Sequence, residues 1–131
     1  DPADGAGDIT KNGLVWSYEL REHCCSTPAV HAGVVYAADC GRLVHCVDAR
    51  TGELCWTHEV DRDVWGSPMV ADGKVYVGTR RGTLYVFAAG REKRLLHSIR
   101  LDSPINGTVT PANGVLYVPT MKSLYAFANG Q

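Results

Sequence analysis

A twelve-residue segment occurs three times in this sequence at an almost constant interval. Residues 26–37, 66–77 and 107–118 each place a short apolar run before a glycine turn and a second apolar run with a tyrosine after it. The turn glycines are Gly33, Gly73 and Gly114, so the interval is 40 and then 41 residues. A unit of this length cannot bury its apolar face alone and does so against its neighbours. The chain is therefore expected to fold as an array of repeated units.

Each unit is predicted to contain up to four short β-strands. The dipeptides Ala-Gly, Asp-Gly and Asn-Gly at the three turns are hairpin signals, because glycine accepts the positive φ of a tight turn. Third strands are expected at residues 43–48, 84–88 and 124–128, and fourth strands at residues 54–60 and 95–101. Four antiparallel strands about every forty residues are typical of one blade of an all-β propeller.

The units divide the chain unevenly. Residues 1–12, rich in aspartate and glycine, are expected to be a connecting segment, and residues 13–20 the fourth strand of a preceding blade. Residues 24–60 and 64–101 then form blades, and residues 105–131 an incomplete one, which makes twelve strands in all. Propeller rings have about four to eight blades, so three do not close one alone. Two arrangements remain open: a segment of a larger ring, or a homodimer that closes a ring by strand exchange.

Charge and hydropathy exclude several classes of function. Thirteen basic and fourteen acidic residues leave a formal net charge of −1, so no overall positive field exists to attract nucleic acid. No apolar run is long enough for a transmembrane helix, and the first residues lack the pattern of a signal peptide. Five cysteines, an odd number, and five histidines show no metal-ligand spacing, so no metal site is predicted.

One segment resembles a known repeat family. Residues 47–56, Val-Asp-Ala-Arg-Thr-Gly-Glu-Leu-Cys-Trp, resemble the tryptophan-docking motif Asp-Ala-x-Thr-Gly-x-x-x-Trp of the PQQ-like (quinoprotein-like) propeller repeat, and the resemblance extends over residues 13–128. It implies that the tryptophan of each blade packs against the next blade, held by the Thr-Gly turn. The residues that match are Trp16, Asp48, Thr51, Gly52 and Trp56. His97 stands where the second blade should carry its tryptophan, so that docking contact is expected to be weaker.

The resemblance implies two classes of function. Members of the family include dehydrogenases of alcohols and sugars that depend on pyrroloquinoline quinone (PQQ) and calcium, and scaffolds of outer-membrane assembly without a cofactor. We expect a non-catalytic scaffold or protein-binding module without a cofactor, with a segment of a PQQ- and calcium-dependent dehydrogenase as the alternative. Either class implies a periplasmic or otherwise extracytoplasmic location.

The adjacent cysteines Cys24 and Cys25, together with Trp65, are the candidates for a cofactor contact. A disulfide between adjacent cysteines lies beside the quinone in some PQQ-dependent dehydrogenases, and the repeat aligns Cys25 with Trp65. A ring of this kind requires a distorted peptide, and other residues serve at the same position in the other units, so a structural role is the main expectation. Cys46 and Cys55 are expected to be buried apolar fillers, and Cys40 to be the most exposed thiol.

Acidic residues at the turns are weighed in the same way. A dehydrogenase of this class needs a carboxylate base and oxygen ligands for calcium. Asp39, Asp63 and Asp102 are candidates because they lie near turns that could face the channel, although nothing in their spacing requires that role. Capping of backbone donors in the turns is the main expectation for them.

A candidate partner surface follows from the turns that join second and third strands. Residues 39–42, 79–82 and 120–122 should gather on the face that also carries the links between blades. Arginine and tryptophan supply much of the energy of protein interfaces, so this face is a candidate surface for a protein partner. Two alternatives remain open: the cations are solvated side chains of the turns, and Trp65 is a plug of the central channel. Its candidate residues are Arg42, Trp65, Arg80, Arg81, Asn106 and Lys122.

Overall fold

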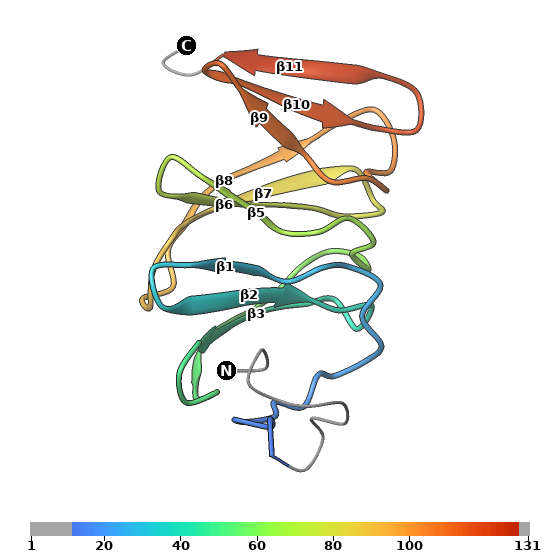
Figure 1. Ribbon diagram of the computed structural model, residues 1–131. Helices are drawn as coiled ribbons and strands as arrows, with labels where there is room; N and C mark the ends of the chain where they lie inside the picture. The colour runs from blue at the N-terminus through green and yellow to red at the C-terminus, as the bar shows by residue number, and fades with distance from the viewer. Residues whose placement is uncertain (1–11, 129–131) are drawn as a thin grey trace.

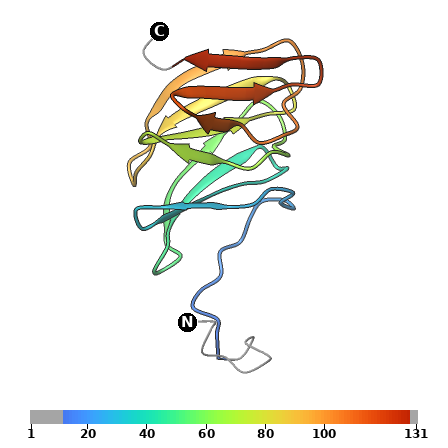
Figure 2. The ribbon, with the colours of Figure 1, turned by 45° about the horizontal axis from the view of Figure 1, so that its top comes forward.

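The computed structural model describes residues 12–128 as three antiparallel β-sheets stacked on one another (Figure 1). The first sheet contains β1 (Ala29–His31), β2 (Val34–Ala38), β3 (Leu43–Asp48) and β4 (Leu54–Glu59). The second contains β5 (Met69–Ala71), β6 (Lys74–Gly78), β7 (Thr83–Ala88) and β8 (Leu95–Arg100). The third contains β9 (Thr110–Ala112), β10 (Val115–Pro119) and β11 (Leu124–Ala128). The expected all-β propeller architecture is confirmed, and the sheets keep their order in the turned view (Figure 2).

The same hairpin turn opens each sheet. The two central residues of each turn both have positive φ: Ala32 and Gly33 (48° and 81°), Asp72 and Gly73 (50° and 71°), Asn113 and Gly114 (51° and 77°). This is the signature of a type I′ turn, whose twist matches that of the flanking strands. The second residue is glycine each time because a side chain there would be strained.

Strand register also repeats from sheet to sheet. The tyrosine of the second strand pairs with the same position of the third strand, as Tyr36 with Cys46 and Tyr76 with Val86. In the two four-stranded sheets the register between the third and fourth strands shifts at equivalent places. The shift lies between Cys46 and Val47 in the first sheet and between Val86 and Phe87 in the second. Such a bulge strengthens the local twist, which suits sheets that fan out around an axis.

The core lies between the sheets. One cluster joins the first and second sheets and includes Tyr36, Trp56 and Phe87. A second cluster joins the second and third sheets and includes Leu84 and Ile105. Since each sheet buries a face against its neighbour, the sheets are the blades that the repeat predicts.

Residues 13–20 differ from the expectation. The sequence predicts a strand there, whereas the structure has none, and the described residues contain eleven strands. A strand is defined by its hydrogen bonds to a neighbouring strand, and none of the strands in residues 12–128 pairs with residues 13–20. Trp16 and Tyr18 instead bond to the first sheet through their side chains. The expected connecting segment, residues 1–12, lies outside the described residues except for Asn12. Within residues 12–128 there is no helix, and hence none that could cross a membrane.

Candidate functional site

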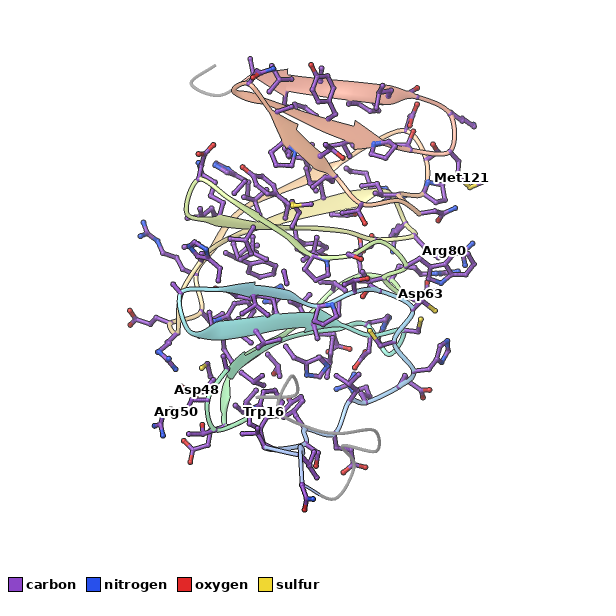
Figure 3. The ribbon with its side chains drawn as sticks, in the orientation of Figure 1. Trp16, Asp48, Arg50, Asp63, Arg80 and Met121 are labelled. Atoms are coloured by element: carbon purple, nitrogen blue, oxygen red, sulfur yellow. The ribbon has the colours of Figure 1, made fainter. Side chains whose placement is uncertain are left out.

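The β2–β3 turn and its counterparts lie on one edge of the stacked sheets, next to the links that lead into each sheet. The same backbone hydrogen bond joins turn to link each time: Cys40 N–H to His23 O (2.9 Å), Arg80 N–H to Asp63 O (3.0 Å) and Met121 N–H to Pro104 O (3.0 Å). We call this side the link edge. In Figure 3, Asp63, Arg80 and Met121 follow this edge, while Trp16, Asp48 and Arg50 lie at the opposite one.

A cluster around Arg80 occupies the middle of the link edge. The guanidinium carbon lies 3.7 Å from the ring centroid of Trp65, an arrangement favourable for a cation–π interaction. Nε of Arg80 donates to the side-chain oxygen of Asn106 (3.3 Å), and the guanidinium lies 3.7 Å from an oxygen of Asp63. Trp65 stays 43% exposed. Three of the expected partner residues, Trp65, Arg80 and Asn106, therefore come together, and each belongs to a different turn or link.

The link edge is less basic than the sequence suggests. Arg42 lies 3.1 Å from Glu59 on β4, and Arg80 faces Asp63. The side chains of Arg81 and Lys122 are exposed. Ion pairs at a surface contribute little stability, but they offset the positive charge that a partner would meet. The edge is therefore a mixed-charge surface around one exposed indole.

The adjacent cysteines do not bond to each other. All five cysteines are free thiols. Sγ of Cys24 lies 3.2 Å from the carbonyl oxygens of Ser26 and Ala38, whereas Sγ of Cys25 lies 3.6 Å from Sγ of Cys40. Cys40 is half-buried while Cys24 and Cys25 are exposed, so the expectation that Cys40 is the most exposed thiol is wrong. Burial and then the nearby Cys25 thiol raise the pKa of Cys40 to about 11.

The spacing of residues along the chain does not predict that Cys25 and Cys40 lie close to His23. The ligand atoms of these three side chains lie within 4.8 Å of one another. Spacing rules search for ligands a few residues apart, and here the backbone bond between link and turn brings distant residues together. Alignment of the three units would have placed these positions on one edge, although not the side chains in contact.

The carboxylates of Asp39 and Asp102 accept hydrogen bonds from nearby groups of the protein. Asp39 is fully buried and accepts bonds from three backbone N–H groups, those of Arg21, Gly41 and Leu43. Hydroxyl donors, Ser123 first and then Thr120, lower the pKa of Asp102. The carboxylates of Asp39 and Asp102 therefore cap donors of their own turns and links.

A buried polar chain in the first sheet was not predicted. Nε2 of His45 lies 2.7 Å from Asp39, and its Nδ1 lies 2.9 Å from the hydroxyl of Tyr18. His45 is 2% exposed. In the second sheet the carboxylate lies instead on the link, where Asp61 accepts from Thr79 and Thr83. The sequence alignment of the two units shows that the carboxylate has changed segment. Arg21 of the first unit aligns with Asp61 of the second, and Asp39 of the first aligns with Thr79 of the second.

The residues of the docking motif lie at the opposite edge. Nε1 of Trp16 donates to Ala49 O (2.9 Å), and the indole lies so close to Gly52 that a Cβ there would be 2.7 Å from it. Asp48 accepts from the backbone N–H and hydroxyl of Thr51. That backbone bond first, and Arg91 second, hold the pKa of Asp48 well below its usual range. The turn thus offers a flat glycine surface on which the indole packs.

Comparisons with known proteins agree with this geometry. The family model described as "Outer membrane protein assembly factor BamB" matches residues 6–95 and 40–130. The quinohemoprotein alcohol dehydrogenase of Comamonas testosteroni is 33% identical over 106 residues, covering 70% of this chain and 15% of the relative. The 1-butanol dehydrogenase (cytochrome c) of Thauera butanivorans is 36% identical over 115 residues, covering 76% and 17%. The chain therefore spans about a sixth of these relatives.

Solved structures show the same fold. BamB from Moraxella catarrhalis superposes with a TM-score of 0.78 at 19% identity, covering 87% of this chain and 36% of that protein. The quinohemoprotein alcohol dehydrogenase ADHIIG from Pseudomonas putida HK5 gives 0.72 at 27% identity, covering 88% and 21%. With the repeat, the docked indoles and the family match all in agreement, the chain belongs to the PQQ-like propeller repeat family represented by the outer membrane protein assembly factor BamB.

Proposed function

We propose that the chain provides three blades of a non-catalytic propeller scaffold, which presents its link edge to a protein partner outside the cytoplasm. The observation that carries this proposal is the exposed Trp65 indole held under Arg80. An aromatic ring already fixed by its neighbours loses little conformational entropy on binding, and tryptophan and arginine dominate many interface energies. Two relatives are outer membrane protein assembly factors, and this similarity supports the extracytoplasmic location.

The contacts of the candidate cofactor residues favour a scaffold over an enzyme. A quinone site of the expected kind would use a disulfide between Cys24 and Cys25, but the thiol of Cys25 faces Cys40. A calcium ion would need several uncommitted oxygens, and those of Asp39 and Asp102 already accept protein donors. The contacts of Cys25, Asp39 and Asp102 therefore do not support a PQQ or calcium site at these residues, and no catalytic step is assigned to them.

The alternative function is a segment of a PQQ- and calcium-dependent dehydrogenase of alcohols or sugars. The identities of 33% and 36% to alcohol dehydrogenases favour it. In that case the calcium ligands and the base would belong to other blades of the whole protein, and Trp65 would face the channel.

Two measurements on the whole protein separate these functions. A scaffold binds neither PQQ nor calcium tightly in calorimetry and oxidises no alcohol with a dye acceptor. A photo-crosslinking residue in place of Trp65 is expected to capture a partner in the native host, whereas the same residue in place of Arg50, on the opposite edge, captures none. Tight PQQ binding with alcohol oxidation would replace the scaffold by the dehydrogenase.

Within residues 12–128 the third sheet has no strand beyond β11. β11 is an edge strand, and its Leu124 is 70% exposed. An exposed strand edge pairs readily with another strand, so we expect it to be covered by further blades or by a second copy of the chain. Light scattering on the 131-residue chain, across a concentration series in a reducing buffer, distinguishes a strand-exchanged dimer from a chain that needs the remaining blades.

A further inference from the structure

Three side chains with metal-ligand chemistry meet at the link edge of the first sheet. They are His23 and Cys25 on the link before β1, and Cys40 in the β2–β3 turn. Their ligand atoms all lie within 4.8 Å of one another, and the two sulfurs are 3.6 Å apart. The hydrogen bond from Cys40 N–H to His23 O, 2.9 Å, holds the two segments in this position.

The spacing of the sulfurs suits a tetrahedral ion. Two thiolates bound to zinc at about 2.3 Å each, at the tetrahedral angle, lie roughly 3.8 Å apart. The observed 3.6 Å is close to this value. His23 and Cys25 are exposed, so small side-chain rotations can bring all three ligand atoms to bonding distance, and an ion can enter from solvent.

The fold does not require these residue types. The corresponding positions hold Asp63, Trp65 and Arg80 in the second unit, and Pro104, Asn106 and Met121 in the third. The second unit joins its link to its turn with the Arg80–Asp63 ion pair and the contact of Arg80 with Trp65. The same backbone bond forms in all three units whatever the side chains are. The cluster of His23, Cys25 and Cys40 is therefore a property of the first unit alone among the described blades.

We infer that His23, Cys25 and Cys40 bind a zinc ion through one imidazole nitrogen and two thiolates, with the fourth position open to water or to a ligand from outside. Two thiolates balance the charge of Zn²⁺, and mixed histidine and cysteine sets are typical of zinc sites. Cys24 is excluded as a ligand because its sulfur lies against the carbonyl oxygens of Ser26 and Ala38. This inference does not depend on the scaffold proposal, since the ion would fasten link to turn in either class of protein.

Cobalt titration of the whole protein tests the site. The protein is kept in a non-thiol reductant, its five thiols are counted, and Co²⁺ is added while thiolate-to-cobalt charge-transfer and tetrahedral ligand-field bands are recorded. We expect saturation at one equivalent and displacement of the bands by Zn²⁺. Fully reduced protein that shows no such bands would overturn the inference.

Variants assign the ligands. Cys25→Ser and Cys40→Ser each remove a sulfur and are expected to weaken cobalt binding by roughly 100-fold or more, and His23→Asn to weaken it and change the ligand-field bands. Cys24→Ser is the matched control and should bind as the parent does. Far-ultraviolet circular dichroism confirms that each variant is folded. Equal loss in Cys24→Ser and Cys25→Ser, or parent-like binding by Cys40→Ser, would contradict the assignment.

Discussion

The contact between the first and second sheets differs from that between the second and third at one aligned position. Trp56 of β4 is 6% exposed, lies 5.2 Å from Phe87 between ring centroids, and donates through Nε1 to Gly90 O at 3.0 Å. Its counterpart His97 on β8 is exposed and lines an open cleft of about 470 Å³ between the second and third sheets. At this position the same backbone pattern carries a buried indole in one contact and an exposed imidazole in the other.

The remaining interactions sharpen this comparison. Both contacts have one short polar bond near the link edge, Thr27 N–H to Ser67 Oγ and Ser67 N–H to Thr108 Oγ1, each 2.9 Å. At the first contact Arg91 also reaches from the second sheet to Asp48 and to Gly33 O. The two contacts therefore share one hydrogen bond between their links, and the first contact has Trp56 and Arg91 in addition among residues 12–128.

Replacement of Trp56 by alanine should produce the largest effect. The change removes a buried indole and its bond to Gly90 O, and large-to-small substitutions of this kind cost about 3–5 kcal/mol. Urea unfolding of the whole protein measures the loss. Trp65→Ala is the matched control, because this indole is 43% exposed and should cost much less. Equal losses in the two variants would show that Trp56 does not seal the contact.

Removal of one hydroxyl at the same contact should have a smaller effect. The Tyr36 hydroxyl accepts the N–H of Gly90 at 2.7 Å, so Tyr36→Phe keeps the ring and deletes one hydrogen bond. We expect a loss of about 0.5–1.5 kcal/mol in the free energy of unfolding. Tyr117→Phe, the aligned change on the more exposed β10, is the control. A loss in Tyr117→Phe as large as in Tyr36→Phe would contradict this explanation.

Sequence reasoning predicts the fold better than the site. The repeat interval and the three glycine turns are local properties, and they place the strands because each blade is built mainly from neighbouring segments. The strand expected at residues 13–20 does not form in the structure. A strand needs a neighbouring strand to pair with, and the apolar pattern of the segment does not show whether residues 12–128 contain one.

Side-chain partners at the link edge are harder to predict. Arg42 meets Glu59, and Cys25 meets Cys40, through contacts set by turn geometry after folding. No pattern of spacing along the chain encodes these directions. The alignment of units predicts which positions share an edge, and the folded structure shows which side chains touch.

Introduction of the missing tryptophan should convert the open contact toward the sealed one. His97→Trp places an indole at the cleft that Leu116 and Phe127 also line. Burial of apolar surface there is expected to raise the free energy of unfolding by roughly 1 kcal/mol. His31→Trp, on the exposed end of β1, is the control and should give no gain. A destabilised His97→Trp would mean that the cleft cannot admit the ring.

The smallest expected effect is a difference in pH dependence at the sealed contact. His58 packs 5.1 Å from Phe87 and 5.8 Å from Tyr85 between ring centroids, and its buried Nδ1 has no partner among the described residues. Burial first, and Lys93 second, lower the pKa of His58 below its ordinary value of 6.5. The unfolded chain therefore binds a proton at higher pH than the folded protein does, so stability is lost as the pH falls from about 7.5 to 5.5. His58→Ile introduces the residue of the aligned position, Ile99, and should reduce the dependence of the free energy of unfolding on pH, measured by urea unfolding. His31→Gln is the control and should leave this dependence unchanged. Parallel pH dependences for the parent and His58→Ile would show that protonation of His58 is not coupled to the contact.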